Sequence, residues 1–517
     1  MLNTSLPCDS LLYTAEQVRE LDKRAIAGLP KAGEEGIPGI QLMKRAGKSV
    51  FDTLLECWPH PEQITVYCGS GNNGGDGYIV AALAKLRQIP VTVIQVGEHG
   101  SLKGDAKLAY EFAKAQSVEM IAFDNVKTKA PEHGVIVDAL LGIGLHGEVR
   151  TPFNHAIEQI NHSQLPVIAV DVPSGLNSDT GSLSGDGKGG ICVKADLTVS
   201  FIGLKRGLFT ALGPEHSGEI FFDDLDVAPE IYETLHEEVK KLDLDDLLDL
   251  LPARSRHAHK GDFGHVLIIG GDHGYGGAVV MAAESAARCG AGLVSVATHA
   301  EHIPAILARR PEVMAHVVEN HHALLPLLQK ATVIVIGPGL GMTPWSEQLL
   351  YHAVQYARQN NIPVVMDADA LNMLAEGRVV TKLPERVILT PHPGEAARLL
   401  QTHTQTIQQD RFTAIKQLQE KYRATIVLKG AGTLVTSDKK LSLCPYGNPG
   451  MATGGMGDVL SGVLGALLAQ HLAPQPAAEL AVCLHSHAAD VVAEEAGERG
   501  LLATDLIAVM HQLINHS

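Results

Sequence analysis

Two glycine-rich segments, one in each half of the chain, hold the residues best suited to chemistry. The first is VYCGSGNNGGDGY at 66–78, and the second combines KGAGT at 429–433 with GNPGMATGGMGDVLSG at 447–462. Each places glycines where a predicted strand passes into a helix, so that backbone N–H groups can hold a phosphate. The two segments therefore predict two nucleotide sites, one for a main substrate and one for a cosubstrate.

The first segment partly fits a dinucleotide loop. GSGNNG at 69–74 satisfies G-x-G-x-x-G after a strand, and Glu98 follows the next predicted strand, where such folds often keep a ribose-binding acid. Asn72, Asn73 and Asp76 argue against an ordinary loop of this kind, because polar side chains obstruct the approach of the pyrophosphate to the backbone. The pattern alone is a weak indication of a standard cofactor site.

Oxygen-bearing side chains follow two further predicted strands. Asp138 ends GVIVD, and Asp171 ends PVIAVD, which continues to Ser174. Because the carboxyl ends of parallel strands meet at one crevice, Asn73, Asp138 and Ser174 can converge there. Oxygen ligands favour a hard cation, and so few carboxylates favour a monovalent ion over Ca²⁺. The alternative is that these side chains satisfy turns and helix caps.

In the second segment, Asp458 begins DVLSGVLGALLA, a largely apolar run that predicts a helix. We expect Asp458 to be the first residue of this helix, beside an anion site at its N-terminus. There it can take a proton from an attacking hydroxyl, an effect on the order of 10²–10⁴ in rate. An unperturbed aspartate, with a pKa of about 3.9, is a weak base, so positioning must supply much of the effect. The alternative is a helix N-cap.

The elements that position these residues form a repeated strand–helix pattern. Val/Ile-rich runs alternate with helix-period segments in both halves, which is typical of parallel strands buried on both faces. The predicted strands are 64–68, 91–96, 134–141, 166–172 and 196–202, then 265–271, 293–298, 332–339, 363–369, 386–392 and 425–430. The pattern predicts an α/β chain of two three-layer αβα domains, the first of them Rossmann-like.

The two series of strands are separated by a charged segment, 223–264, which has no strand-like run and predicts one or two helices. We place the first domain at 1–228, a linker at 229–244 and the second domain at 245–517. Near the start of the chain, Thr14 and Gln17 form a capping-box pattern for a helix.

The composition limits the possible partners. A length of 517 residues predicts two or three domains. The net charge of −17 and the 4% aromatic content argue against a nucleic-acid or membrane partner. The start of the chain has no signal-peptide pattern, and 459–478 predicts a buried helix and turn. Seven scattered cysteines indicate neither zinc nor disulfides, so we expect a cytoplasmic location.

Three motifs in the first half carry a specific resemblance. NNGGDGY, DALLGIGLHGE and VDVPSGLNSDTG resemble, in this order, the YjeF N-terminal domain of the NAD(P)H-hydrate epimerase family, over about residues 10–225. GIGLHGE departs from the more usual GTGLxxP at Ile143 and Glu148. The resemblance implies K⁺ ligation by Asn73, Asp138 and Ser174. It implies contacts to the hydrated nicotinamide nucleotide from Asn72, Asn73, Gly74, Gly75, Asp76, Gly142, Ile143, Gly144, Leu145, His146, Gly147, Glu148 and Asp171. Asp171 is the candidate base, with ribose or substrate anchoring as the alternative.

The second half resembles another family. GDFGHVLIIGGDHGYGGA, GPGLG, DADALNML, LTPHPGEAARLL, KGAGT and NPGMATGGMGDVLSG are similar to the ADP/ATP-dependent NAD(P)H-hydrate dehydratases, of ribokinase-like αβα fold, over about residues 245–515. The resemblance implies hydrate contacts from Ala278, Gly339, His392 and Asp458. It implies adenine-nucleotide contacts from Lys429, Gly430, Ala431, Gly432, Thr433 and Gly457, with Mg²⁺ at the transferring phosphates. Without its motif, His392 would be interpreted as a turn residue.

A kinase-like fold can serve a dehydration. Hydroxide is a poor leaving group, since water has a pKa of about 15.7. Phosphate, with a second pKa of about 6, leaves far more easily. Phosphorylation of the hydrate hydroxyl, assisted by Asp458, followed by elimination would restore the dihydropyridine.

The resemblances together imply a bifunctional enzyme that epimerises the R and S hydrates of NADH and NADPH. It would then dehydrate the S form with ADP, or alternatively ATP. We also expect a homo-oligomer.

Two alternatives stay open. One is a ribokinase-type kinase for a small molecule such as a hydroxymethylpyrimidine or a thiazole. The other is a non-catalytic N-terminal scaffold, against which the retention of Asn73, Asp138, Asp171 and Ser174 argues.

Overall fold

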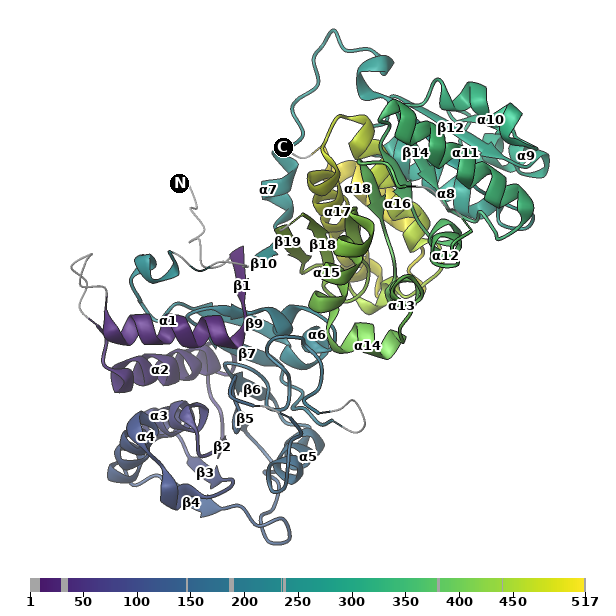
Figure 1. Ribbon diagram of the computed structural model, residues 1–517. Coiled ribbons are helices and arrows are strands. Elements are labelled where there is room, and N and C mark those ends of the chain that lie inside the picture. Colours follow the sequence, from purple (N-terminus) through teal and green to yellow (C-terminus); the bar gives the residue numbers. More distant parts are fainter. Residues whose placement is uncertain are drawn as a thin grey trace. The chain divides into compact units, whose positions relative to one another are not determined.

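The computed structural model describes residues 10–28, 36–145, 147–185, 190–233, 235, 239–378, 382–438 and 440–515. The chain divides into two compact units between Lys240 and Lys241, inside the segment predicted as a linker (Figure 1). Each unit is an α/β structure with a largely parallel sheet. None of the helices within the described ranges combines the length and hydropathy of a membrane span.

The sheet of the first unit has the strand order β4-β3-β2-β5-β6-β7-β9, and its pairings are parallel. Its strands are β2 (Ile64–Cys68), β3 (Val91–Gln95), β4 (Glu119–Ala122), β5 (Val135–Ala139), β6 (Val167–Val170), β7 (Leu197–Phe201) and β9 (Glu219–Asp223). All five predicted strands are confirmed. The sequence missed β4 and β9 because these edge strands are only partly buried and lack a continuous apolar run.

Helices cover both faces of this sheet, as Figure 1 shows. They are α1 (Ala15–Ala27), α2 (Gly39–Cys57), α3 (Asn72–Leu86), α4 (Gly104–Ala115), α5 (Phe153–Ser163) and the short α6 (Gly213–Ser217). Successive strand residues point to opposite faces. Val66 therefore packs in the core with α2, α3 and α4, whereas its neighbour Tyr67 packs in the core with α5. The predicted three-layer arrangement follows from this alternation.

The predicted capping box at the start of α1 is confirmed. The Thr14 side chain accepts the N–H of Gln17, and the Gln17 side chain accepts the N–H of Thr14. Near this helix, β1 (Leu11–Tyr13) pairs with β8 (Leu204–Lys205) and with β10 (Val239–Lys241). The expectation that 223–264 contains no strand is wrong at β10, which is too short to show an alternating pattern.

The sheet of the second unit has the order β13-β12-β11-β14-β15-β16-β17-β18-β19. Its strands are β11 (His265–Ile269), β12 (Leu293–Thr298), β13 (Met314–Val317), β14 (Val333–Ile336), β15 (Val364–Met366), β16 (Val387–Leu389), β17 (Thr425–Leu428), β18 (Thr433–Ser437) and β19 (Lys440–Cys444). All six predicted strands are confirmed. The sequence missed β13 and the antiparallel hairpin β18–β19 that extends the parallel sheet.

The helices of this unit are α7 (Leu244–Leu248), α8 (Gly276–Arg288), α9 (Ile303–Arg309), α10 (His321–Leu328), α11 (Pro344–Asn360), α12 (Asp369–Ala375), α13 (Pro393–Leu400), α14 (Thr404–Gln409), α15 (Arg411–Tyr422), α16 (Met456–Ala469), α17 (Pro474–Ala496) and α18 (Asp505–Leu513). The main core joins α8, α16, α17 and α18 to the strands. Helix α16 begins at Met456, because Gly455 takes a left-handed conformation at its N-cap. Asp458 is therefore the third residue of the helix, which corrects the expectation that it is the first.

Candidate active sites at the carboxyl ends of the two sheets

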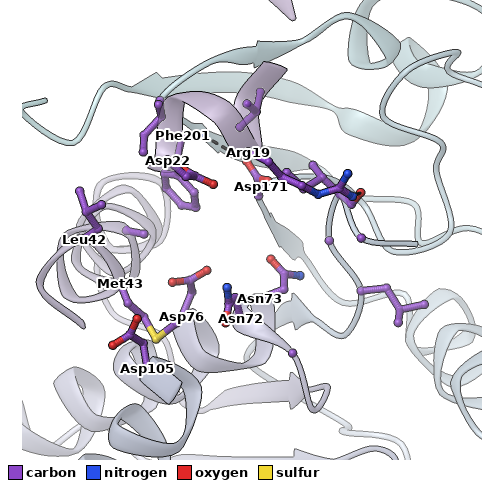
Figure 2. Close-up of a pocket in the computed structure, with 18 of the residues that line it drawn as sticks. Arg19, Asp22, Leu42, Met43, Asn72, Asn73, Asp76, Asp105, Asp171 and Phe201 are labelled. Atoms are coloured by element: carbon purple, nitrogen blue, oxygen red, sulfur yellow. Dashed lines mark hydrogen bonds between the residues drawn. The ribbon is translucent and has the colours of Figure 1, made fainter. Parts of the chain in front are cut away.

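In the first unit, the order of the strands creates a crevice between the loops that follow β2 and β5. From β2 the sheet extends to β3 on one side and to β5 on the other, which is the switch point where open α/β sheets bind ligands. A cavity of about 710 Å³ opens there (Figure 2). The predicted residues that line it are Asn72, Asn73, Asp76, Gly142, Ile143, Gly144, Leu145 and Asp171.

The remaining predicted residues of the first site lie elsewhere. Gly74 and Gly75 are buried in the first turn of α3, where an added Cβ would meet the Gly69 carbonyl oxygen at 1.9 Å and the Met43 sulfur at 2.6 Å, respectively. Their role in the structure is close packing. Gly147 and Glu148 are exposed and do not line the cavity, and His146 lies outside the described residues. A contact of this loop with a ligand stays a prediction.

Two of the three predicted cation ligands form a buried network. Asp138 Oδ1 accepts the Ser174 hydroxyl at 2.6 Å, and Asp138 Oδ2 accepts the Ser174 N–H at 2.8 Å. Asp138 also accepts the N–H of Leu140, two residues further on, so it satisfies a turn as the alternative interpretation expected. Both side chains are completely buried.

The third predicted ligand, Asn73, has a buried amide nitrogen without an acceptor among the described residues. Because amide oxygen and nitrogen positions are assigned from their hydrogen bonds, a half-turn of this amide places its oxygen there instead. Burial raises the pKa of Asp138 to about 6, against the hydrogen bonds from Ser174 and Leu140. An adjacent cation would favour the charged carboxylate. This all-oxygen donor set fits a monovalent cation.

Asp171 directly follows β6 in a left-handed conformation, with a φ of 67°. Its carboxylate forms a short ion pair with Lys205, which is 1% exposed. The Lys205 ammonium also donates to the Phe201 carbonyl at 2.8 Å, and the Phe201 N–H donates to Asp171 at 3.2 Å. Lys205 thereby holds Asp171 at the edge of the cavity. Lys205 was not predicted from the sequence, because it stands in an apolar, glycine-containing segment outside the recognised motifs.

Two more aspartates face this pair. Asp22 and Asp76 point toward the cavity from opposite sides in Figure 2. Burial raises the pKa of Asp76 well above its usual range, and the charges of Asp171 and Asp22 raise it further. Burial likewise raises the pKa of Asp22 to about 6, although Lys205 opposes this shift. The cavity thus contains a carboxylate paired with lysine and two carboxyl groups that hold protons more strongly, an arrangement able to donate and accept protons.

In the second unit, Asp367 follows β15, and residues after the next two strands and from α16 converge on it. Lys429, which follows β17, donates to Asp367 Oδ1 at 2.8 Å. Thr390, after β16, donates to the same oxygen at 2.8 Å, and Ser461 of α16 donates to Oδ2 at 2.9 Å. Burial alone would raise the pKa of Asp367, but Lys429 and these hydrogen bonds lower it. Asp367 and Lys429 therefore form a buried ion pair.

Asp458 lies next to this pair. Burial raises the pKa of Asp458 to about 7, the charge of Asp367 adds to the shift, and Lys429 opposes it. A carboxyl group with a pKa near neutrality is suited to general base catalysis. The alternative role as N-cap is excluded, because Gly455 occupies that position.

The other predicted residues of the second site gather at the same end of the sheet. A Cβ added to Gly457 would lie 3.2 Å from Asp367 Oδ2 and 3.3 Å from Lys429 Nζ, so this glycine keeps the start of α16 close to the ion pair. A Cβ added to Gly339, whose φ is 55°, would lie 3.1 Å from the side chain of Ala278, at the start of α8. Helices α8 and α16 pack together.

His392 caps the start of α13, where the plainer interpretation expected a turn residue. Its Nδ1 accepts the N–H of Gly394 at 3.0 Å at the start of α13, and its side chain is half exposed. Burial and the charge of Lys429 lower the pKa of His392, which favours the neutral ring. Glu395, whose pKa is raised by burial, lies 4.0 Å from Lys429. Contact of His392 with a ligand stays a prediction.

The KGAGT loop runs from Lys429 into β18. Gly430 and Gly432 have φ angles of 137° and 63°, which favour glycine, and Ala431 lies between them. The Thr433 hydroxyl donates to the Gly430 carbonyl at 3.0 Å. Asp367, in the motif DADALNML, was not predicted as a site residue, although its place at a strand end was a signal. Arg411, which contacts this loop, has no such signal in the sequence.

Comparison with known proteins identifies both halves. Residues 39–207 match the model for the YjeF-related protein N-terminus, and residues 266–512 match the model for NAD(P)H-hydrate dehydratase. The chain is also similar to a solved ribokinase-like superfamily protein from Enterococcus faecalis, with 32% identity and a TM-score of 0.50. That similarity covers 53% of this chain and 95% of the other.

The chain matches curated relatives over their whole length. The chain is 48% identical to the bifunctional NAD(P)H-hydrate repair enzyme Nnr of Coxiella burnetii, over 98% of this chain and 100% of the relative. It is 41% identical to the enzyme of the same name from Vibrio cholerae, over 99% and 100% of the two chains. The chain therefore belongs to the family of bifunctional NAD(P)H-hydrate repair enzymes.

Proposed function

We propose that the first unit interconverts the R and S hydrates of NADH and NADPH, and that the second dehydrates the S form with ADP or ATP as phosphoryl donor. Two relatives that align with the chain over their whole length are named bifunctional NAD(P)H-hydrate repair enzymes. The single observation that best supports the chemistry is Asp458, whose pKa is about 7, next to Lys429 and the glycine-rich loop.

For dehydration, Asp458 accepts the proton of the hydrate hydroxyl while that oxygen attacks the terminal phosphorus of the nucleotide. Lys429 and the N–H groups at the start of α16 stabilise the phosphate charge. The C–O bond then breaks, phosphate leaves with the oxygen, and loss of a proton from the neighbouring carbon restores the dihydropyridine. The products are NAD(P)H, phosphate and the shortened nucleotide.

For epimerisation, a bond at the hydroxyl-bearing carbon has to break and form again on the other face. Asp171, held by Lys205, is the candidate proton acceptor. Asp76, whose raised pKa favours the protonated form, is the candidate donor. Retention of both groups in one cavity supports a catalytic domain over a scaffold.

Two cations complete the proposal. K⁺ would be held by Asn73, Asp138 and Ser174, and it would supply a fixed positive charge for the nucleotide phosphates. Mg²⁺ would enter with the nucleotide.

The test is a mixture of the purified protein with racemic NADH hydrate, K⁺, Mg²⁺ and either ADP or ATP. We expect the dihydronicotinamide absorbance to return for all of the hydrate, with ADP as the preferred donor. Recovery of only about half, the S share of a racemate, would contradict the epimerase assignment. Accumulation of a stable phosphorylated product, without free phosphate, would favour the kinase alternative.

A further inference from the structure

Arg411 is a completely buried cation behind the KGAGT loop. It is the first residue of α15 and is 0% exposed. Its guanidinium donates to the carbonyl oxygens of Leu428 at 3.1 Å, Lys429 at 3.3 Å and Gly432 at 3.3 Å. A further bond goes to the Gln408 side-chain oxygen at 3.1 Å. One side chain thus binds three carbonyl groups along five consecutive residues.

This position is unfavourable for a cation. Burial lowers the pKa of Arg411 to about 10, and the N-terminal end of a helix repels positive charge. The hydrogen bonds to the carbonyl oxygens named above offset part of the cost of burying the guanidinium. A buried charge is costly unless it is paired or hydrogen-bonded, so the bonds of Arg411 hold its side chain in place together with the carbonyl groups that accept them.

The carbonyl groups bound by Arg411 determine where the loop amides point. A trans peptide places its C=O and N–H on opposite sides. Because the Lys429 carbonyl points toward Arg411, the N–H of Gly430 points away from it. This N–H has no acceptor among the described residues. A Cβ at position 430 would lie 2.7 Å from Arg411 Nη1, so glycine is needed for the contact.

We propose that Arg411 is the positioning residue of the adenine-nucleotide site: it turns the carbonyl groups of Leu428, Lys429 and Gly432 inward, so that the loop presents N–H groups and a buried positive charge to the phosphates. This inference rests on the proposed function, which gives the loop its ligand. Arg411 itself does not touch the nucleotide.

The test compares full-length wild type with Arg411→Lys, Arg411→Met and Lys416→Met. Lys416 is an exposed cation on the same helix, so its variant controls for the loss of one positive charge. The readouts are the Kd for ADP by equilibrium dialysis, the KM for ADP and for the S hydrate, kcat, the epimerisation rate and the melting temperature.

We expect Arg411→Met to weaken ADP binding by about tenfold or more, as for lost hydrogen bonds to a charged donor. Arg411→Lys keeps the charge but not the fork of donors, so it should recover part of the affinity. The KM for the S hydrate, epimerisation and every property of Lys416→Met should stay within about twofold of wild type. If Arg411→Met does not fold, Gly430→Ala with Arg411 in place should give the same ADP-specific defect.

An unchanged Kd for ADP in a folded Arg411→Lys variant would overturn the inference, and so would equal losses for ADP and hydrate. Wild type that binds ADP but does not dehydrate the hydrate would defeat the proposed function instead. In that case the effect of Arg411 on the Kd for ADP would still decide the inference.

Discussion

Within the described residues, each unit has a largely buried lysine–aspartate pair at the carboxyl end of its sheet, but the candidate base is part of the pair in one unit and lies beside it in the other. In the first unit Lys205 binds Asp171, the candidate base, at the wall of the cavity. In the second unit Lys429 binds Asp367, which is 2% exposed, and the candidate base Asp458 lies beside the pair. The same pairing therefore fixes a base in one site and sits next to a base in the other.

In both units, the carboxyl groups that lie beside the lysine–aspartate pair have raised pKa values. Once a lysine is paired, a second carboxyl group nearby gains less from its charge, and burial then dominates. Asp458 has its pKa raised to about 7 in this way, and Asp22 and Asp76 have raised pKa values beside Lys205. Substitutions that remove one pair or one base at a time should therefore separate the two sites.

The largest expected effect is on Asp458. Asp458→Asn should lower the rate of dehydration of the S hydrate by about 10³-fold, because a general base contributes on the order of 10²–10⁴. Epimerisation, followed by separating the two hydrates chromatographically, should be unchanged. Glu420→Gln, an exposed change on α15, is the control. Loss of both activities in Asp458→Asn would show that the division of labour is wrong.

The next effect concerns the other pair. Lys205→Met should lower epimerisation by about 10²-fold, since Asp171 loses its ion pair and its position. Dehydration of pure S hydrate should remain at the wild-type rate. Asp171→Asn should give the same pattern. If either variant slows dehydration with S hydrate as substrate, the two sites are not independent.

The pH dependence of dehydration should follow the protonation of Asp458. Only the deprotonated form of Asp458 accepts a proton, so dehydration should reach a plateau above pH 8. Below the pKa of about 7 it should fall by about tenfold for each pH unit. Because Lys429 lowers the pKa of Asp458, Lys429→Met should move this inflection upward. A flat kcat profile between pH 5.5 and 8.5 is the result that would count against Asp458 as the base.

The smallest expected effect is on the K⁺ requirement of epimerisation. Ser174→Ala removes a hydroxyl that binds Asp138 and is a proposed ligand of K⁺. The K⁺ concentration for half-maximal epimerisation should rise several-fold, while dehydration of S hydrate stays the same. The measurement is a K⁺ titration against a tetramethylammonium background. An unchanged K⁺ requirement would place the ion elsewhere.

The sequence predicts the interior of both sheets well. Buried parallel strands are continuous apolar runs, and the glycines and aspartates at their ends follow from that pattern. Edge strands such as β4 and the hairpin β18–β19 lack this signal. The start of α16 was misplaced because Gly455 supplies a left-handed N-cap, which a run of glycines does not reveal.

Site residues were predictable only where they belong to a motif. Asp138, Asp171 and Asp458 stand at strand or helix ends with recognisable neighbours. Lys205 and Arg411 act on partners 34 and 17 to 21 positions away, and no local pattern marks such long-range contacts. The raised pKa of Asp458 depends in the same way on burial and on Asp367, 91 positions earlier (458 minus 367).

The central claim is that two independent sites act in succession on one metabolite, and complementation tests it most directly. Pure R hydrate is incubated with K⁺, Mg²⁺ and ADP in the presence of Asp171→Asn, Asp458→Asn, or an equal mixture of both variants. The assay time is kept shorter than the time in which the hydrates interconvert spontaneously. Neither variant alone should restore the dihydronicotinamide absorbance, whereas the mixture should convert all of the R hydrate. An inactive mixture, or full conversion by either variant alone, would contradict the account.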